Sequence, residues 1–132
     1  MKTLGELFQS ADWKKEKHVP VIDCPDQVKE AEMFMVKVTV GKEAPHPNTT
    51  EHHIRWISLY FLADGEKFPY EIGRFEFNAH GESVDGPNKG SVYTNPEITA
   101  TIKVSKSGMI YASALCNIHG LWSSEKALKL GQ

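Results

Sequence analysis

The stretch MFMVKVTVG, residues 33–41, decides how the rest of this sequence is interpreted. Apolar side chains occupy every second position from residue 34 to residue 40, and polar Lys37 and Thr39 lie between them. A period of two is typical of a β-strand with one buried face. The stretch therefore predicts a half-buried strand that ends at Gly41.

Further segments along the chain have the same period, or are short apolar runs between turn residues. They are HVPVIDCP (18–25), HIRWISLYFL (53–62), YEIGRFEFNA (70–79), SVYT (91–94), EITATIKV (97–104) and MIYASALC (109–116). The pairs Asp64-Gly65 and Ser107-Gly108 supply turns, and no segment between the strands has the pattern of a crossover helix. About seven strands in this arrangement predict an all-β fold, an immunoglobulin-like antiparallel β-sandwich.

Helical signals are confined to the two ends of the chain. Leu4, Leu7 and Phe8 have helical spacing, which predicts a short N-terminal helix. At the other end, SSEKALKL (123–130) predicts one or two helical turns with Ser123 as the N-cap. No linker or repeat divides the chain, so we expect residues 1–132 to form a single domain.

Composition excludes several classes of function. The 132 residues carry a formal net charge of −2, which gives no electrostatic support for a nucleic-acid partner or an anionic membrane. No apolar run approaches the roughly 18 residues of a membrane span, and the N-terminus lacks the apolar core of an export signal. We therefore expect a cytoplasmic protein whose two thiols, Cys24 and Cys116, stay reduced, with Cys24 in a structural role.

Five side chains of types that can bind metals, four histidines and one cysteine, lie in loops or at strand ends. Cys116 and His119 form a C-x2-H pair where the last predicted strand ends, and His46 and His52 lie in APHPNTTEHHI (44–54). His18 lies in EKHVP (16–20). His53 should face away from His52, because successive side chains of an extended segment alternate.

Each of these residues has a simpler interpretation when it is taken alone. A loop histidine is usually solvated, and a free cysteine is usually a small buried hydrophobe. Together, four imidazoles and one thiolate suit iron, copper, nickel or zinc. A structural zinc site needs only four ligands, and a blue-copper site needs an axial methionine that no residue after Met109 supplies. Four nitrogens and one sulfur would instead form a square pyramid with one open position.

The segments EKHVP, HPNTTEHHI (46–54) and CNIHGLW (116–122) resemble the motifs of superoxide reductase in its one-iron form, neelaredoxin, which is the catalytic module of desulfoferrodoxin. The resemblance covers essentially the whole chain and implies a mononuclear ferrous centre. His18, His46 and His52 would bind through the outer ring nitrogen and His119 through the inner one, with Cys116 as axial thiolate. The chain lacks the CxxC motifs of the two-iron relatives, so we expect one iron.

The resemblance also implies a reaction and its participants. Superoxide would be reduced to hydrogen peroxide, which serves detoxification under oxidative stress. Glu16 would be the mobile carboxylate that takes the sixth iron position after turnover, and Lys17 would attract the anion and organise water. Rubredoxin would donate the electrons, and the protein would be a homotetramer. The alternative is a non-catalytic metal-binding sandwich or electron carrier, such as a colourless zinc protein.

Overall fold

The predicted half-buried strand is β3 (Phe34–Val40) of the computed structural model, which describes residues 1–131. Its alternate residues Phe34, Val36, Val38 and Val40 are buried, whereas Met35 and Lys37 are exposed. β3 is the middle strand of a three-stranded antiparallel sheet, between β1 (Pro20–Asp23) and β6 (Glu97–Ile102). The period of two therefore specified both the strand and the face that it buries.

The second sheet has five strands in the order β2-β8-β7-β4-β5. Its members are β2 (Gln27–Val28), β4 (Ile54–Ala63), β5 (Tyr70–Glu76), β7 (Gly108–Cys116) and β8 (Gly120–Leu130). All neighbours are antiparallel except the short pair β2–β8, which is parallel. β4 and β7 are the long central strands, and both are largely buried.

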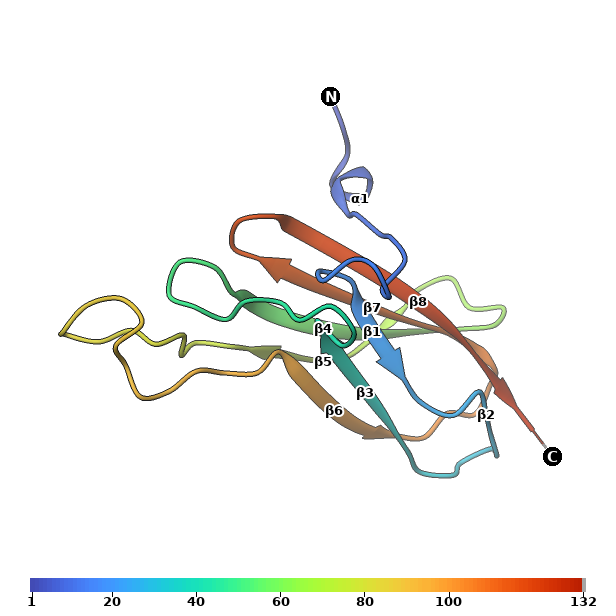
Figure 1. Cartoon of the computed structure of the whole chain (residues 1–132). Coiled ribbons are helices and arrows are strands. Elements are labelled where there is room, and N and C mark those ends of the chain that lie inside the picture. Colours follow the sequence, from blue (N-terminus) through green and yellow to red (C-terminus); the bar gives the residue numbers. More distant parts are fainter. Residues whose placement is uncertain (132) are drawn as a thin grey trace.

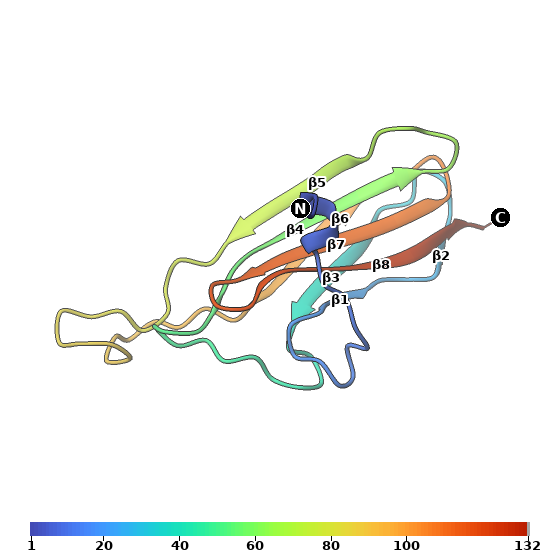
Figure 2. The ribbon, with the colours of Figure 1, turned by 90° about the horizontal axis from the view of Figure 1, so that it is seen from above.

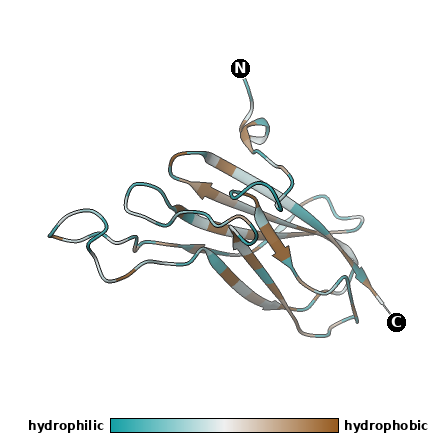
Figure 3. Cartoon of the chain, in the orientation of Figure 1, coloured by the Kyte–Doolittle hydropathy of each residue, from teal (hydrophilic) through white to brown (hydrophobic). Residues whose placement is uncertain are grey.

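The two sheets pack face to face, as Figures 1 and 2 show from two directions. Between them lies one apolar core, to which β3, β4 and β7 contribute most of the buried side chains. Hydrophobic positions follow the strands, and the connecting loops are more hydrophilic (Figure 3). The predicted all-β, immunoglobulin-like sandwich is confirmed, with eight strands within residues 1–131 rather than about seven.

The predicted N-terminal helix is confirmed as α1 (Leu4–Leu7), one turn capped by the Thr3 hydroxyl, which accepts a hydrogen bond from the Glu6 N–H. α1 buries none of its residues and stands away from the sandwich (Figure 1). Leu4 and Leu7 are exposed as a result.

Two sequence predictions were wrong. The tail 123–130 is not helical: it belongs to β8, where Ser123 pairs with Ser113 and Leu128 is buried against the core. The segment 91–94 is not a strand, and only Tyr93 within it forms an isolated bridge, to His80. In both cases long-range pairing, or its absence, overrode a weak local preference.

Several loops that are distant in sequence lie together at one end of the sandwich. β4 begins and β7 ends at this end, because Ile54 pairs with Cys116.

The two cysteines are free, with Cys116 buried and Cys24 partly buried against the core. Within residues 1–131, no helix has the length and apolar character needed to cross a membrane.

Candidate metal centre

Four chain segments meet at this end and bring the five predicted ligands together. His18 lies two residues before β1, His46 and His52 lie in the loop from β3 to β4, Cys116 ends β7, and His119 lies in the turn between β7 and β8. Gly41 lets the loop from β3 to β4 fold back with His46 close to the main chain of Gly41. Its φ is +85°, and a Cβ there would lie 2.5 Å from the main-chain nitrogen of His46.

Four of the five side chains offer donor atoms that lie within 4.8 Å of one another: those of His18, His52, Cys116 and His119. His119 Nδ1 is central to the group. It lies 3.1 Å from His18 Nε2, 3.3 Å from His52 Nε2 and 3.7 Å from Cys116 Sγ. His18 and Cys116 are buried and His119 is exposed, so the cluster opens to the surface.

His46 completes the cluster from the side. Its ring centroid lies 4.8 Å from that of His18 and 4.6 Å from that of His52. Its Nδ1–H donates to the Pro47 carbonyl at 2.6 Å, so the lone pair of the neutral ring is on Nε2. That Nε2 is buried and has no hydrogen-bond partner. Burial lowers the pKa of His46 to about 4, which keeps the ring neutral near pH 7.

These features fit a bound transition metal. Two nitrogens on adjacent positions of an ion, each about 2.1 Å from it, lie about 3 Å apart, which agrees with the 3.1 and 3.3 Å separations around His119 Nδ1. A buried imidazole nitrogen without a partner is costly unless something binds it. Imidazoles with one thiolate are donors that iron accepts.

Glu16 lies on the outer side of His18. Its Oε1 lies 2.6 Å from His18 Nδ1 and accepts a hydrogen bond from the His18 main-chain N–H at 3.0 Å. Burial works against ionisation here, but the hydrogen bonds from the His18 side chain and main chain outweigh it and lower the pKa of Glu16. Glu16 therefore orients the ring so that His18 Nε2 faces the cluster, and in this position it does not itself point into the cluster.

Lys17 is partly buried beside the cluster. Burial is the main reason why the pKa values of His18, His46 and His52 are lowered, and the positive charge of Lys17 contributes to the lowering at all three. Its field therefore reaches the place where the ring nitrogens converge.

His53 and His80 lie outside the cluster and form a pair of their own. Their rings stack with centroids 3.5 Å apart and planes 8° apart. His53 Nδ1 lies 2.9 Å from the Thr49 carbonyl, so its ring turns away from that of His52. Burial, followed by the charge of His53, lowers the pKa of His80.

Sequence reasoning missed Asn117, which ties the loop of Cys116 to the loop of His52. Its side-chain oxygen accepts the His53 N–H at 2.9 Å, and its side-chain nitrogen donates to the Glu51 carbonyl at 2.8 Å. The only local signal was its place inside the CNIH motif, because the partners are more than 60 residues away in sequence.

Comparison with known proteins identifies the family. The family described as desulfoferrodoxin matches residues 10–125. The chain belongs to the desulfoferrodoxin family. Among curated members, the neelaredoxin of Megalodesulfovibrio gigas is 58% identical over 125 residues, which cover 95% of this chain and 96% of that protein. The superoxide reductase of Pyrococcus furiosus is 57% identical over 126 residues, covering 96% and 99%.

Solved structures of the desulfoferrodoxin family share the fold. The superoxide reductase (neelaredoxin) of Archaeoglobus fulgidus in the reduced form superposes with a TM-score of 0.87 at 60% identity, covering 94% of this chain and 99% of that one. That of Ignicoccus hospitalis gives 0.79 at 38% identity and covers 98% and 100%. The sandwich and its loops are therefore those of this family.

Proposed function

We propose that this protein is a superoxide reductase with one mononuclear non-haem iron per chain. Its proposed ligands are His18, His46, His52, Cys116 and His119. The observation that carries the proposal is the buried, unpartnered Nε2 of His46 beside four converging donor atoms at the open end of the sandwich. Relatives that align over nearly the whole chain bear the name superoxide reductase, which supports the same activity.

The reaction is superoxide plus one electron plus two protons giving hydrogen peroxide, without release of oxygen. An iron ion held by these five residues would supply the electron, which an external donor would restore. Because the protein would supply only five donors, such an ion would still be able to bind the substrate. Bound as a thiolate, Cys116 would raise the electron density of such a centre, as cysteine ligands do in haem proteins.

Lys17 and Glu16 are the proposed catalytic residues. Lys17 attracts the superoxide anion and organises water for proton delivery, and its effect on three neighbouring histidines supports such a local positive field. Glu16 holds Nδ1 of His18 and thereby orients Nε2. A rotation of its partly exposed side chain would bring the carboxylate to the open position and assist departure of the peroxide.

Three finer proposals follow from membership of the family. A rubredoxin supplies the electrons, the protein acts in the cytoplasm, and four chains assemble into a homotetramer. The exposed apolar side chains of α1, Leu4 and Leu7, support assembly, because a single sandwich gives them nothing to pack against.

The test is to count the metal, record visible spectra in both redox states, and measure the products after pulses of superoxide. We expect one iron per chain, a thiolate-to-iron charge-transfer band in the oxidised form, and peroxide without oxygen. A colourless zinc protein would establish the structural alternative. Oxygen released together with peroxide would indicate a dismutase.

A further inference from the structure

Trp122 of β8 contacts two of the proposed ligands. Trp122 is 8% exposed, and its indole lies nearly parallel to the ring of His18, with the centroids 4.9 Å apart and the planes 15° apart. Its Nε1–H donates to the main-chain carbonyl of His119 at 3.2 Å. One side chain therefore touches the ring of the first ligand in the chain and the main chain of the last.

The position of Trp122 is itself fixed by hydrogen bonds from both sides. In the sheet it pairs with Ala114 of β7. On the other side Gln9 bridges to it: the Gln9 N–H donates to the Leu121 carbonyl at 3.0 Å, and the Ser123 N–H donates to the Gln9 carbonyl at 2.9 Å. The Gln9 side chain also donates to the His119 carbonyl at 3.0 Å, so this oxygen accepts two hydrogen bonds.

A parallel indole does more than fill space beside a metal-bound imidazole. Metal binding withdraws electrons from the imidazole ring, and the electron-rich face of tryptophan stabilises an electron-poor or cationic neighbour. The withdrawal is greater when the ion carries a higher charge. The stack therefore favours the oxidised centre over the reduced one, in addition to holding the plane of the His18 ring.

We propose that Trp122 is a positioning residue of the metal centre: by stacking on His18 and bonding the His119 main chain, it orients both ligands and lowers the reduction potential of the iron. This inference rests on the proposed iron site. Outer contacts of this kind tune both the affinity and the electronics of metal centres.

The experiment compares Trp122→Leu, which removes the stack and the N–H, with Trp122→Phe, which keeps an aromatic ring. Trp56→Phe is the matched control, because Trp56 lies on β4 with its ring against Arg74 at 3.9 Å, outside the donor cluster. The reduction potential and the position of the charge-transfer band are measured on iron-loaded protein, and thermal stability is measured on metal-free protein.

We expect Trp122→Leu to shift the redox equilibrium towards the reduced form about threefold, which for one electron is about 30 mV. Trp122→Phe should shift it less in the same direction, and Trp56→Phe should leave it unchanged. If Trp122→Leu does not fold, the comparison of the two phenylalanine variants decides. Lower stability with a wild-type potential and band would overturn the inference, because a side chain that only fills the core has that effect.

The controls separate this inference from the proposed function. Wild-type protein that binds no iron, or that lacks the charge-transfer band, would refute the iron site itself. If wild-type protein shows the charge-transfer band and the Trp122 variants have the wild-type reduction potential, only the role of Trp122 is refuted.

Discussion

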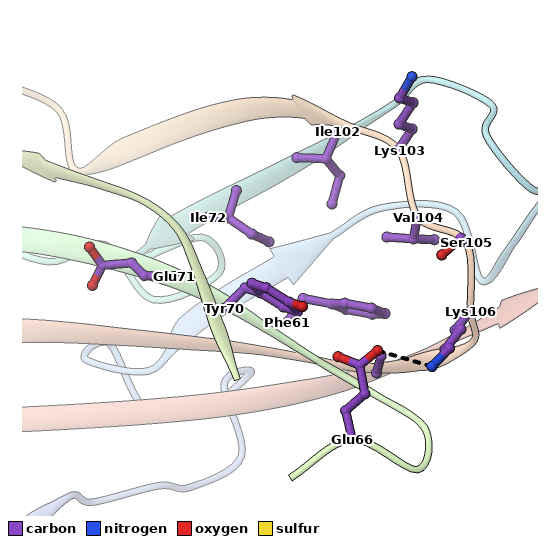
Figure 4. A pocket seen from close by; sticks show the side chains of 11 residues that line it. Phe61, Glu66, Tyr70, Glu71, Ile72, Ile102, Lys103, Val104, Ser105 and Lys106 are labelled. Atoms are coloured by element: carbon purple, nitrogen blue, oxygen red, sulfur yellow. Dashed lines mark hydrogen bonds and ion pairs between the residues drawn. The ribbon is translucent and has the colours of Figure 1, made fainter. Parts of the chain in front are cut away.

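The two ends of the sandwich both contain hollows lined by charged and polar groups, yet they differ in how those groups are paired. At the end opposite the donor cluster, a cavity of about 430 Å³ opens between β5 and β6 (Figure 4). Its floor is apolar, with Phe61, Ile72 and Ile102. On its rim Lys106 donates to Glu66 at 3.0 Å. Glu71, which also lines the cavity, accepts a hydrogen bond at 3.1 Å from Ser58, a buried residue of β4 behind it.

The end of the sandwich that carries the donor cluster of His18, His52, Cys116 and His119, called the ligand end from here on, differs in this respect. The described residues contain three buried side-chain atoms without a hydrogen-bond partner, in His46, Asn48 and His80, and all three belong to loops at this end. Charged and polar groups at the cavity pair with one another, whereas the buried His46 Nε2 beside the donor cluster has no partner. A larger hollow of about 510 Å³, lined by His53 and His80, does not include the donor residues, so incomplete pairing locates the cluster better than the size of a hollow does.

The largest expected effect comes from Cys116→Ser, because it removes the only sulfur donor of the proposed ligand set. We expect loss of the charge-transfer band and of most superoxide reduction. Cys24→Ser is the matched control and should change neither quantity, because Cys24 lines a separate hollow together with Met35 and Lys37. A band that survives in the Cys116 variant would remove this residue from the ligand set.

The adjacent residues His52 and His53 allow a test, within one loop, of which histidine belongs to the proposed ligand set. His52→Ala should lose most of the bound iron, because His52 Nε2 faces the cluster, whereas His53→Ala should keep it, because the His53 ring stacks on His80. Iron content per folded chain is the measurement. Equal loss from both variants would contradict the assignment.

The sequence specified the parts of the molecule that depend on local pattern. The alternation of residues 34–40 was sufficient to place β3, and three motifs in order were sufficient to name every residue that now converges at the cluster. Family resemblance carried the identity of the metal, because spacing alone left several metals open.

The remainder depends on contacts between distant segments. Residues 123–130 have a serine and a leucine spacing that favour a helix, but pairing with β7 places them in a strand. Neither the stack of His53 on His80 nor that of Trp122 on His18 has a local signature, because each joins residues far apart in the chain.

Acid should destabilise the metal-free protein through the ligand end. The pKa of His46 is about 4 when folded and about 6.5 when unfolded, so the unfolded chain binds more protons between these values. The contribution is fully present above pH 6.5 and is lost as the pH falls towards 4, on the order of 3 kcal/mol. Denaturant unfolding across this range measures it. His46→Gln should flatten the dependence, and an unchanged slope in that variant would assign the effect to other groups.

Lys17 and Lys106 carry the same charge at opposite ends, which allows a test of steering. Lys17→Ala should slow the bimolecular reaction with superoxide about tenfold, or roughly 1.4 kcal/mol of barrier, and should flatten its salt dependence. Lys17→Arg should stay near the wild-type rate. Lys106→Ala should also leave the rate unchanged, and pulse radiolysis at several salt concentrations measures all three. A Lys17→Ala rate equal to that of Lys106→Ala would mean that Lys17 is an ordinary solvated lysine.

The smallest expected effect lies at the cavity. The side chains of Lys106 and Glu66 are 53% and 31% exposed, so their ion pair should contribute only about 0.2–1 kcal/mol to the free energy of unfolding. Lys106→Ala and Glu66→Ala should each cost no more than this, lose the effect at high salt, and leave iron content and potential unchanged. β4 and β7 run from this cavity to the ligand end, since Ala63 pairs with Gly108 and Ile54 pairs with Cys116. A change of potential in either variant would therefore show that the two ends are coupled along these strands, and that the paired charges at the cavity serve the centre as well as the fold.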